Sequence, residues 1–120
     1  MARKLVMMGL AGGLLLASVA GTTQAEHAAA AHKTYHVQIV TNEQTIGAYK
    51  PKTITVHRGD RIIFKNVSNA PHTVSADNNS FASATIATGK SWTYVAKKVG
   101  TFTYFCQFHP GMHGKLVVKP

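Results

Sequence analysis

Cysteine and methionine are scarce in this 120-residue sequence, and each scarcity excludes a class of protein. The single cysteine, Cys106, rules out a domain held together by intrachain disulfides, which needs an even number of cysteines. Three of the four methionines lie within the first eight residues, so Met112 is the only methionine in the rest of the chain. A methionine-rich metal carrier is therefore not indicated.

Apolar runs long enough to cross a bilayer are also missing from the start of the chain. The uncharged stretch Leu5–Ala20 has 16 residues, fewer than the roughly 20 that a membrane-spanning helix needs. It follows Arg3 and Lys4 and precedes Thr23–Ala25, which is the order of a secretory signal peptide. We therefore expect residues 1–25 to be a signal peptide that is cleaved on export to the periplasm, leaving no membrane attachment.

Acidic residues are scarce as well, since 4 Asp and Glu stand against 13 Lys and Arg, a net charge of +9 at pH 7. Cleavage after residue 25 removes Arg3 and Lys4 and leaves 11 basic and 4 acidic residues, a net charge of +7. The remaining cations form no run longer than two, which, together with export, argues against binding to nucleic acid. A basic surface favours acidic partners through electrostatic steering.

The 95 residues after the expected cleavage site suffice for one compact domain. Residues 26–33, mostly Ala and His, predict a flexible N-terminal segment, and residues 34–120 predict the domain. In that domain, short stretches alternate between apolar and polar residues with the period of a strand, and turn residues separate them. The stretches that we expect to form strands are 35–39, 53–56, 61–65, 72–75, 91–95, 101–106 and 115–119.

No stretch of the domain repeats its apolar residues at helical spacing over three turns. Short strands with turn signals between them predict an all-β sandwich or barrel. The turn at His57–Asp60 further predicts that residues 53–56 and 61–65 pair as a hairpin.

One motif near the C-terminus carries metal chemistry. Cys106, His109 and Met112 follow one another at the spacing Cys-x2-His-x2-Met, and Pro110 with Gly111 permits a sharp reversal between the last two. In a strand ending at Cys106, alternation with Phe102 and Tyr104 points the thiol inward. Thiolate and thioether suit Cu(I), and imidazole binds copper in both oxidation states, so the set predicts a copper site.

A blue-copper site needs a second imidazole. His57 lies in a turn, His36 falls on the polar face of the first strand, and His113 directly follows Met112 and should point away. His72 is favoured, because it follows the stiff residue Pro71 and comes from a separate strand.

Two other interpretations of Cys106 compete with copper binding. An inward cysteine often serves as a small apolar core residue, and a Cys with a His three residues later also occurs in zinc sites. A structural zinc site, however, commonly uses paired cysteines, and the sequence has no second one. Methionine is also a poor zinc ligand, so the combined pattern favours copper.

Residues 49–119 resemble the small cupredoxins, the plastocyanin and amicyanin group of type 1 blue copper proteins. The matching segments are 52–60, 64–66, 70–74, 99–106 and 109–118. The resemblance implies a Greek-key β-sandwich of about seven to eight strands with one copper ion at one end. It also implies that His72, Cys106 and His109 bind the copper, with Met112 as the weak axial ligand.

One residue departs from the pattern of that family. Many members carry Asn directly after the first histidine ligand, where its side chain ties that strand to the cysteine strand, but this chain has Thr73. Groups around the ligands tune a metal centre, so the departure bears on the reduction potential rather than on the identity of the ligands.

The function expected from this site is the transfer of single electrons between redox partners by Cu(II)/Cu(I). We expect a monomer that meets transient partners with acidic surfaces at the His109 end, where an apolar rim should surround the imidazole. The rim residues are Ala70, Pro71, Phe108, Pro110 and Gly111.

Two alternatives compete with an electron carrier. Copper oxidases and nitrite reductases place histidine beside the blue-copper cysteine, but here Phe105 and Gln107 flank it, so we predict no enzyme activity. A periplasmic copper-binding or copper-tolerance protein is the second alternative, and His27 and His32 are the only features that favour it.

Overall fold

The computed structural model describes residues 31–41 and 47–120 of the chain, and the compact unit that contains the strands begins at His32. The signal peptide expected over residues 1–25, and most of the segment expected over 26–33, lie outside the described residues. Within the described ranges, no helix is long and apolar enough to span a membrane.

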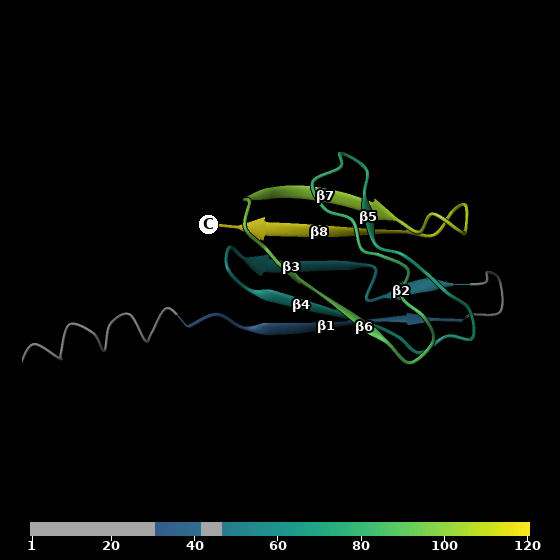
Figure 1. Ribbon diagram of the computed structural model, residues 1–120. Coiled ribbons are helices and arrows are strands. Elements are labelled where there is room, and N and C mark those ends of the chain that lie inside the picture. The colour runs from purple at the N-terminus through teal and green to yellow at the C-terminus, as the bar shows by residue number, and fades with distance from the viewer. Residues whose placement is uncertain (1–30, 42–46) are drawn as a thin grey trace, which may run out of the picture. The chain divides into compact units, whose positions relative to one another are not determined.

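Two four-stranded sheets pack face to face (Figure 1). One sheet has the order β2-β1-β4-β6 and the other the order β3-β8-β7-β5. The strands are β1 (Thr34–Val40), β2 (Ala48–Lys50), β3 (Thr53–His57), β4 (Arg61–Asn66), β5 (Ser75–Ala76), β6 (Ser91–Val95), β7 (Gly100–Phe105) and β8 (His113–Lys119). The prediction of an all-β sandwich of about seven to eight strands is confirmed.

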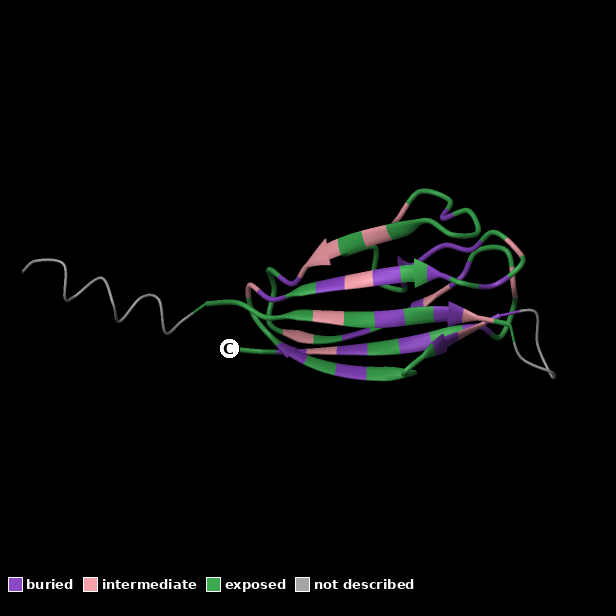
Figure 2. Ribbon diagram, turned by 90° about the horizontal axis from the view of Figure 1, so that it is seen from below, coloured by how far each residue is buried: buried purple, intermediate pink, exposed green. Residues whose placement is uncertain are grey.

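The alternation in the sequence explains which faces the sheets bury (Figure 2). Val37 and Ile39 of β1 and Ile62 and Phe64 of β4 are fully buried, and the residues between them are exposed or half-buried. Tyr104 of β7 meets Phe64 from the opposite sheet, with ring centroids 5.6 Å apart and the rings nearly perpendicular. Burial of such side chains, at about 25 cal/mol per Å² of apolar surface, holds the two sheets together.

The predicted hairpin of residues 53–56 and 61–65 is wrong. β3 pairs in parallel with β8, whereas β4 pairs in parallel with β1 and antiparallel with β6, so the two strands belong to different sheets. The alternate apolar side chains of β3 and β4 are buried in the same core, which the two strands face from opposite sheets. The turn signal at His57–Asp60 was correct, but the turn crosses between the sheets instead of joining neighbours.

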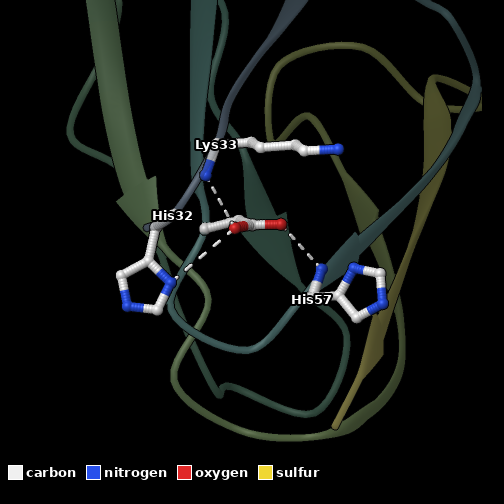
Figure 3. A network of polar contacts seen from close by, with 4 residues as sticks. His32, Lys33 and His57 are labelled. Carbon is white, nitrogen blue, oxygen red and sulfur yellow. Dashed lines mark hydrogen bonds and ion pairs between the residues drawn. The ribbon is translucent and has the colours of Figure 1, made fainter. Parts of the chain in front are cut away.

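A buried carboxylate closes this crossing at the far end of the sandwich, where β3 ends and β4 begins. The Asp60 carboxylate accepts hydrogen bonds from the backbone N–H groups of Lys33 (2.9 Å) and His57 (2.8 Å), and the His32 ring lies 3.9 Å away (Figure 3). Asp60 is 3% exposed. The carboxylate therefore fixes the entry of β1 and the end of β3 to the same point.

The opposite end holds the loops that matter for function. β1, β4 and β7 end there, at Val40, Asn66 and Phe105, and β8 begins there at His113. The connections that leave these strands bring residues 66–74 and 105–113 together, and Thr73 forms hydrogen bonds with Cys106 and with Gln107.

Candidate metal centre

Cys106 lies directly after β7 and faces the core, as the alternation with Phe102 and Tyr104 predicted. All three are buried, and Cys106 is 3% exposed. The backbone N–H of Cys106 donates to the carbonyl of Met112 at 3.1 Å, which continues the pairing of β7 with β8 by one further step. The thiol is thus held by a regular strand end and not by a free loop.

The loop from Cys106 to Met112 is a tight turn. The N–H of His109 donates to the Cys106 carbonyl at 3.4 Å, and the N–H of Met112 donates to the His109 carbonyl at 3.1 Å. Gly111 has φ +87°, a left-handed conformation that favours glycine and lets the chain reverse at this point. The turn brings Nδ1 of His109 to 3.4 Å from Sγ of Cys106.

His72 reaches the same point from a segment 34 positions earlier in the chain. Its backbone pairs with that of Ile86 in an isolated bridge, through N–H to carbonyl hydrogen bonds of 3.2 and 2.8 Å, one in each direction, which fixes the path of this segment. The His72 side chain is fully buried. Its Nδ1 lies 3.6 Å from Sγ of Cys106, and its ring centroid lies 4.5 Å from that of His109.

One ligand atom from each of His72, Cys106 and His109 lies within 4.8 Å of the others. The space next to Gly47 shows that Met112 lies beside this cluster. A methyl group built on Gly47 would lie 2.9 Å from Sδ of Met112 and 3.0 Å from Nδ1 of His72, so both atoms face the same small space. Met112 is 4% exposed. The four residues that the sequence singled out are therefore brought together.

The remaining described histidines lie elsewhere. His36, His57 and His113 are exposed, and none belongs to the three-residue cluster found in the described part of the chain. His32 lies beside Asp60 at the far end. The selection of His72 from the sequence thus agrees with the geometry, and His27 lies outside the described residues.

Thr73, which stands where the resemblance led us to expect an Asn, links the His72 and Cys106 segments. Its Oγ1 accepts the backbone N–H of Gln107 at 2.9 Å, which ties the His72 segment to the residue after Cys106. Its own N–H points at Sγ of Cys106 at 3.4 Å, and its carbonyl accepts a hydrogen bond from the Tyr49 hydroxyl at 2.5 Å. The Thr73 hydroxyl is therefore a direct link between the two segments that carry His72 and Cys106.

The electrostatics of His72 suit metal binding. Burial in the core, and secondarily the neighbouring His109, lower the pKa of His72 below its ordinary value. A neutral imidazole offers a lone pair, which a protonated one cannot. Its other nitrogen, Nε2, lies 2.8 Å from Oγ of Ser68.

Four further residues support the cluster, and the sequence did not identify them as such: Gly47, Tyr49, Asn66 and Ser68. The contacts of Tyr49 with Thr73 and of Gly47 with Met112 join segments that are distant in the chain. Asn66 and Ser68 precede His72 by six and four residues, and local pattern alone reads them as ordinary turn residues. The only signal in the sequence was that Ser68, a polar residue, stands four positions before His72.

The donor set fits copper. Two imidazole nitrogens with one thiol sulfur, beside a buried thioether, match the type 1 combination, and the absence of a second cysteine in the sequence leaves a structural zinc site short of thiolates. His72, Cys106, His109 and Met112 therefore form a cluster typical of a type 1 copper site.

Comparison with curated proteins finds plastocyanins. The chain is 30% identical over 87 residues to "Plastocyanin minor isoform, chloroplastic" of Arabidopsis thaliana, a match that covers 60% of this chain and 51% of that relative. The chain thus spans about half the length of that protein. It is 28% identical over 119 residues to "Plastocyanin, chloroplastic" of Chlamydomonas reinhardtii, covering 87% of this chain and 81% of the relative.

Solved structures agree. A purple cupredoxin from Nitrosopumilus maritimus superposes with a TM-score of 0.60 at 25% identity, covering 68% of this chain and 98% of that one. The reduced state of an amicyanin mutant superposes with a TM-score of 0.58 at 24% identity, covering 72% of this chain and 82% of that one, which shows the shared fold. The two curated relatives are plastocyanins by name, and the prediction that this chain is not an enzyme agrees with them.

The model of the family described as "Cupredoxin-like domain" matches residues 13–118, and so spans both sheets and all four residues of the cluster. The sandwich, the cluster and the relatives agree with this match, and this chain therefore belongs to the cupredoxin-like domain family.

Proposed function

We propose that this protein carries single electrons between redox partners through one type 1 copper ion held by His72, Cys106, His109 and Met112. The observation that carries the proposal is the convergence of two imidazole nitrogens and one thiol sulfur within 4.8 Å, beside a buried thioether. Bound copper would supply a one-electron couple, Cu(II)/Cu(I), at this point.

The chain's own part in this function is to hold the ligands still. Cys106 is fixed by the β7–β8 pairing, His72 by its bridge to Ile86, and Thr73 links the two segments. Because the sandwich sets these positions, gain or loss of an electron requires little movement of the side chains. Four protein ligands also leave little room for a substrate, which favours electron transfer over catalysis.

Partners would dock where an apolar surface surrounds His109, which is half-buried and the less covered of the two imidazoles. Two of the three exposed large apolar side chains in the described residues, Phe108 (47%) and Val67 (46%), lie at this end of the sandwich. A small apolar patch with an imidazole edge suits a brief, weak encounter. Electrons would leave through His109.

The charge distribution bears on the kind of partner. Six exposed cations lie at the far end of the sandwich: Lys33, Arg58, Arg61, Lys97, Lys98 and Lys119. Attraction of an acidic partner to these residues alone would bring it to the end opposite the cluster. We therefore assign docking to the apolar surface and to the fewer cations near it, such as Lys115, and keep an acidic partner as a prediction.

Export to the periplasm, with cleavage after residue 25, is part of the proposal. The support is the order of basic, apolar and small residues at the start of the chain. Mass spectrometry of the exported protein tests it, and we expect the mass of a chain that begins at Glu26. A mass that includes residues 1–25 would contradict cleavage.

The central experiment is a visible absorption spectrum of the protein with Cu(II). We expect an intense blue band from thiolate-to-copper charge transfer, lost in Cys106→Ser. His113→Gln is the matched control, since this exposed histidine next to Met112 lies outside the cluster, and the band should persist in it. A pale spectrum that Cys106→Ser leaves unchanged would overturn the proposal.

A copper-binding or copper-tolerance protein is the competing function. A metal cargo must enter and leave readily, but His72, Cys106 and Met112 are 0%, 3% and 4% exposed. Replacement of both His27 and His32 by Gln separates the two functions, and it leaves in place Lys33, whose N–H binds Asp60. An electron carrier keeps its blue band and reversible potential, whereas a carrier that relies on His27 and His32 loses copper uptake.

A further inference from the structure

A chain of three buried polar side chains runs from the end of β4 to the metal cluster. Oγ of Ser68 lies 2.6 Å from Oδ1 of Asn66 and 2.8 Å from Nε2 of His72. Asn66 and His72 are fully buried, and Ser68 is 3% exposed. Because solvent does not reach them, the direction of each hydrogen bond has to be settled within the chain itself.

Asn66 sets that direction. Its Nδ2 lies 2.7 Å from the carbonyl of Ala70 and 2.8 Å from the carbonyl of Ile86, so both of its amide hydrogens are donated to backbone oxygens. The opposite orientation of the amide would place its oxygen against two carbonyl oxygens. Oδ1 therefore faces Ser68 and can only accept.

Ser68 has a single hydroxyl hydrogen to place. Its Oγ and Oδ1 of Asn66 are two oxygens 2.6 Å apart, a distance that requires a hydrogen between them. Asn66 Oδ1 cannot supply that hydrogen, so Ser68 donates it. The carbonyl of Ala70, at 3.0 Å, is a longer alternative acceptor for Oγ, and it already accepts from Asn66.

Oγ of Ser68 is then left to accept hydrogen bonds, from the backbone N–H of Ala70 at 3.3 Å and, at a shorter distance, from His72. Nε2 of His72 lies 2.8 Å from an oxygen whose own hydrogen is committed elsewhere, so Nε2 must carry the proton and donate it. In a neutral imidazole, the other nitrogen is then unprotonated. That nitrogen, Nδ1, lies 3.6 Å from Sγ of Cys106, with its lone pair directed at the cluster.

We propose that Asn66 and Ser68 form a relay that fixes His72 as the Nε2–H tautomer before any metal binds, so that Nδ1 is ready as a ligand. The part concerning copper rests on the proposed function above, but the tautomer of the metal-free protein does not. In the other tautomer, an N–H would point into the cluster and Nε2 would face Ser68 with two lone pairs opposed. Ser68 and Asn66 are thus positioning residues that act through His72.

The direct test is a nitrogen-15 NMR spectrum of the metal-free, reduced protein at pH 8, in which the two ring nitrogens of each histidine are resolved. His72→Gln identifies the His72 signals by their loss. We expect a protonated Nε2 and an unprotonated Nδ1, with no second form. A protonated Nδ1, or an averaged pair of signals typical of two exchanging tautomers, would overturn the proposal without the need for any variant of Ser68.

A second experiment measures the effect of the relay. Ser68→Ala removes the acceptor and should give a mixture of His72 tautomers, together with Cu(II) binding that is weaker by about tenfold. Ser83→Ala is the matched control, because its hydroxyl accepts the backbone N–H of Val74 at 2.9 Å on a nearby segment and belongs to no contact of the relay. The control should keep the single tautomer and the wild-type affinity. An unchanged tautomer in Ser68→Ala would contradict the relay.

The two proposals fail in different ways. If the protein shows no blue band with Cu(II) but His72 is the Nε2–H tautomer, the copper function is wrong and the relay stands. If the blue band is present and Nδ1 is protonated in the metal-free protein, the function stands and the relay is wrong.

Discussion

The two ends of the sandwich bury polar groups in contrasting ways. At the far end, the Asp60 carboxylate accepts two backbone N–H groups, from Lys33 and His57, and so holds main chain to main chain. At the cluster end, Asn66 and Ser68 form a chain of side chains that ends on the His72 ring. The first arrangement fixes where strands begin and end, whereas the second fixes the orientation of one imidazole.

This difference separates stability from function in the molecule. The Asp60 carboxylate binds backbone N–H groups at the end of β3 and before β1, far from the cluster, so its loss should act on the fold. In the relay, Asn66 also binds the backbone carbonyls of Ala70 and Ile86, but the hydroxyl of Ser68 acts on the His72 ring and determines which nitrogen faces the thiol. Substitutions at the two ends should therefore have distinct consequences, which range from a large loss of stability to a small change in the rate of electron transfer.

The largest loss of stability is expected from Asp60→Ala. Two hydrogen bonds to a charged acceptor disappear, and each is worth about 1.5 kcal/mol or more, so the free energy of unfolding should fall by about 3 kcal/mol. The copper band should not change, because the cluster lies at the other end. Denaturant unfolding of the metal-free protein and a visible spectrum of the copper form measure the two effects.

Asp77→Ala is the control for that experiment. Asp77 is also acidic but exposed, and its carboxylate accepts a hydrogen bond from the Thr103 hydroxyl on β7. Removal of an exposed contact of this kind should cost less than about 1 kcal/mol. If Asp60→Ala and Asp77→Ala cost the same, or if Asp60→Ala altered the blue band, the separation of the two ends would fail.

The contribution of the Asp60 carboxylate should also appear in the pH dependence of the free energy of unfolding. Burial by itself raises the pKa of Asp60, but hydrogen bonds from the N–H groups of Lys33 and His57 and the nearby His57 and His32 rings outweigh it and lower the pKa below its ordinary value. A lowered pKa in the folded state means that the contribution is complete above the ordinary value of about 3.9. It is lost as the pH falls through the lower, folded value.

Asp60→Asn should therefore differ from the wild type most above about pH 4, with the two unfolding free energies converging at lower pH. Unfolding curves collected across this range check the expectation. A gap that stays constant down to the acid limit would mean that Asp60 acts by its shape and not by its charge.

A smaller loss of stability, with a change in metal binding, is expected from Thr73→Val at the cluster end. The substitution keeps the shape of the side chain but leaves the Gln107 N–H without its acceptor, at a cost of about 1–2 kcal/mol. Because the His72 and Cys106 segments are then less firmly joined, Cu(II) affinity should also fall, by up to about tenfold. A competition titration with a copper chelator measures the affinity.

Thr55→Val serves as the control, since Thr55 is an exposed threonine on β3, away from the cluster. It should change neither the affinity nor the stability by a measurable amount. If Thr73→Val lowered stability and left Cu(II) affinity intact, the hydroxyl would belong with Asp60 as a purely structural contact.

The same contrast explains how much the sequence could predict. Cys106, His109 and Met112 lie within seven residues, so their meeting depends on one turn, and local spacing reveals it. The alternating strands are local in the same sense. His72 required elimination among several histidines, because its contact with Cys106 spans 34 positions.

What the sequence did not reveal is long-range or depends on the direction of a hydrogen bond. The hydroxyl of Tyr49 reaches Thr73 across 24 positions, and the separation of β3 from β4 into different sheets depends on partners elsewhere in the chain. Asn66 and Ser68 have the composition of an ordinary turn. Only the distances among them, to His72 and to backbone carbonyls show that one arrangement of hydrogens satisfies them all.

The smallest effect concerns charge. Lys115 follows Met112 by three residues and lies at the beginning of β8, near the cluster, whereas Lys98 lies at the far end, and both are exposed. With hexacyanoferrate(III), a small anionic oxidant, Lys115→Glu should slow oxidation of the reduced copper protein about twofold at low ionic strength. Lys98→Glu makes the same change in net charge and should slow it less, since its field is screened over the length of the sandwich. Added salt should remove the difference. Equal slowing by both variants would mean that net charge alone attracts the oxidant, and stronger slowing by Lys98→Glu would place the exit for electrons away from His109.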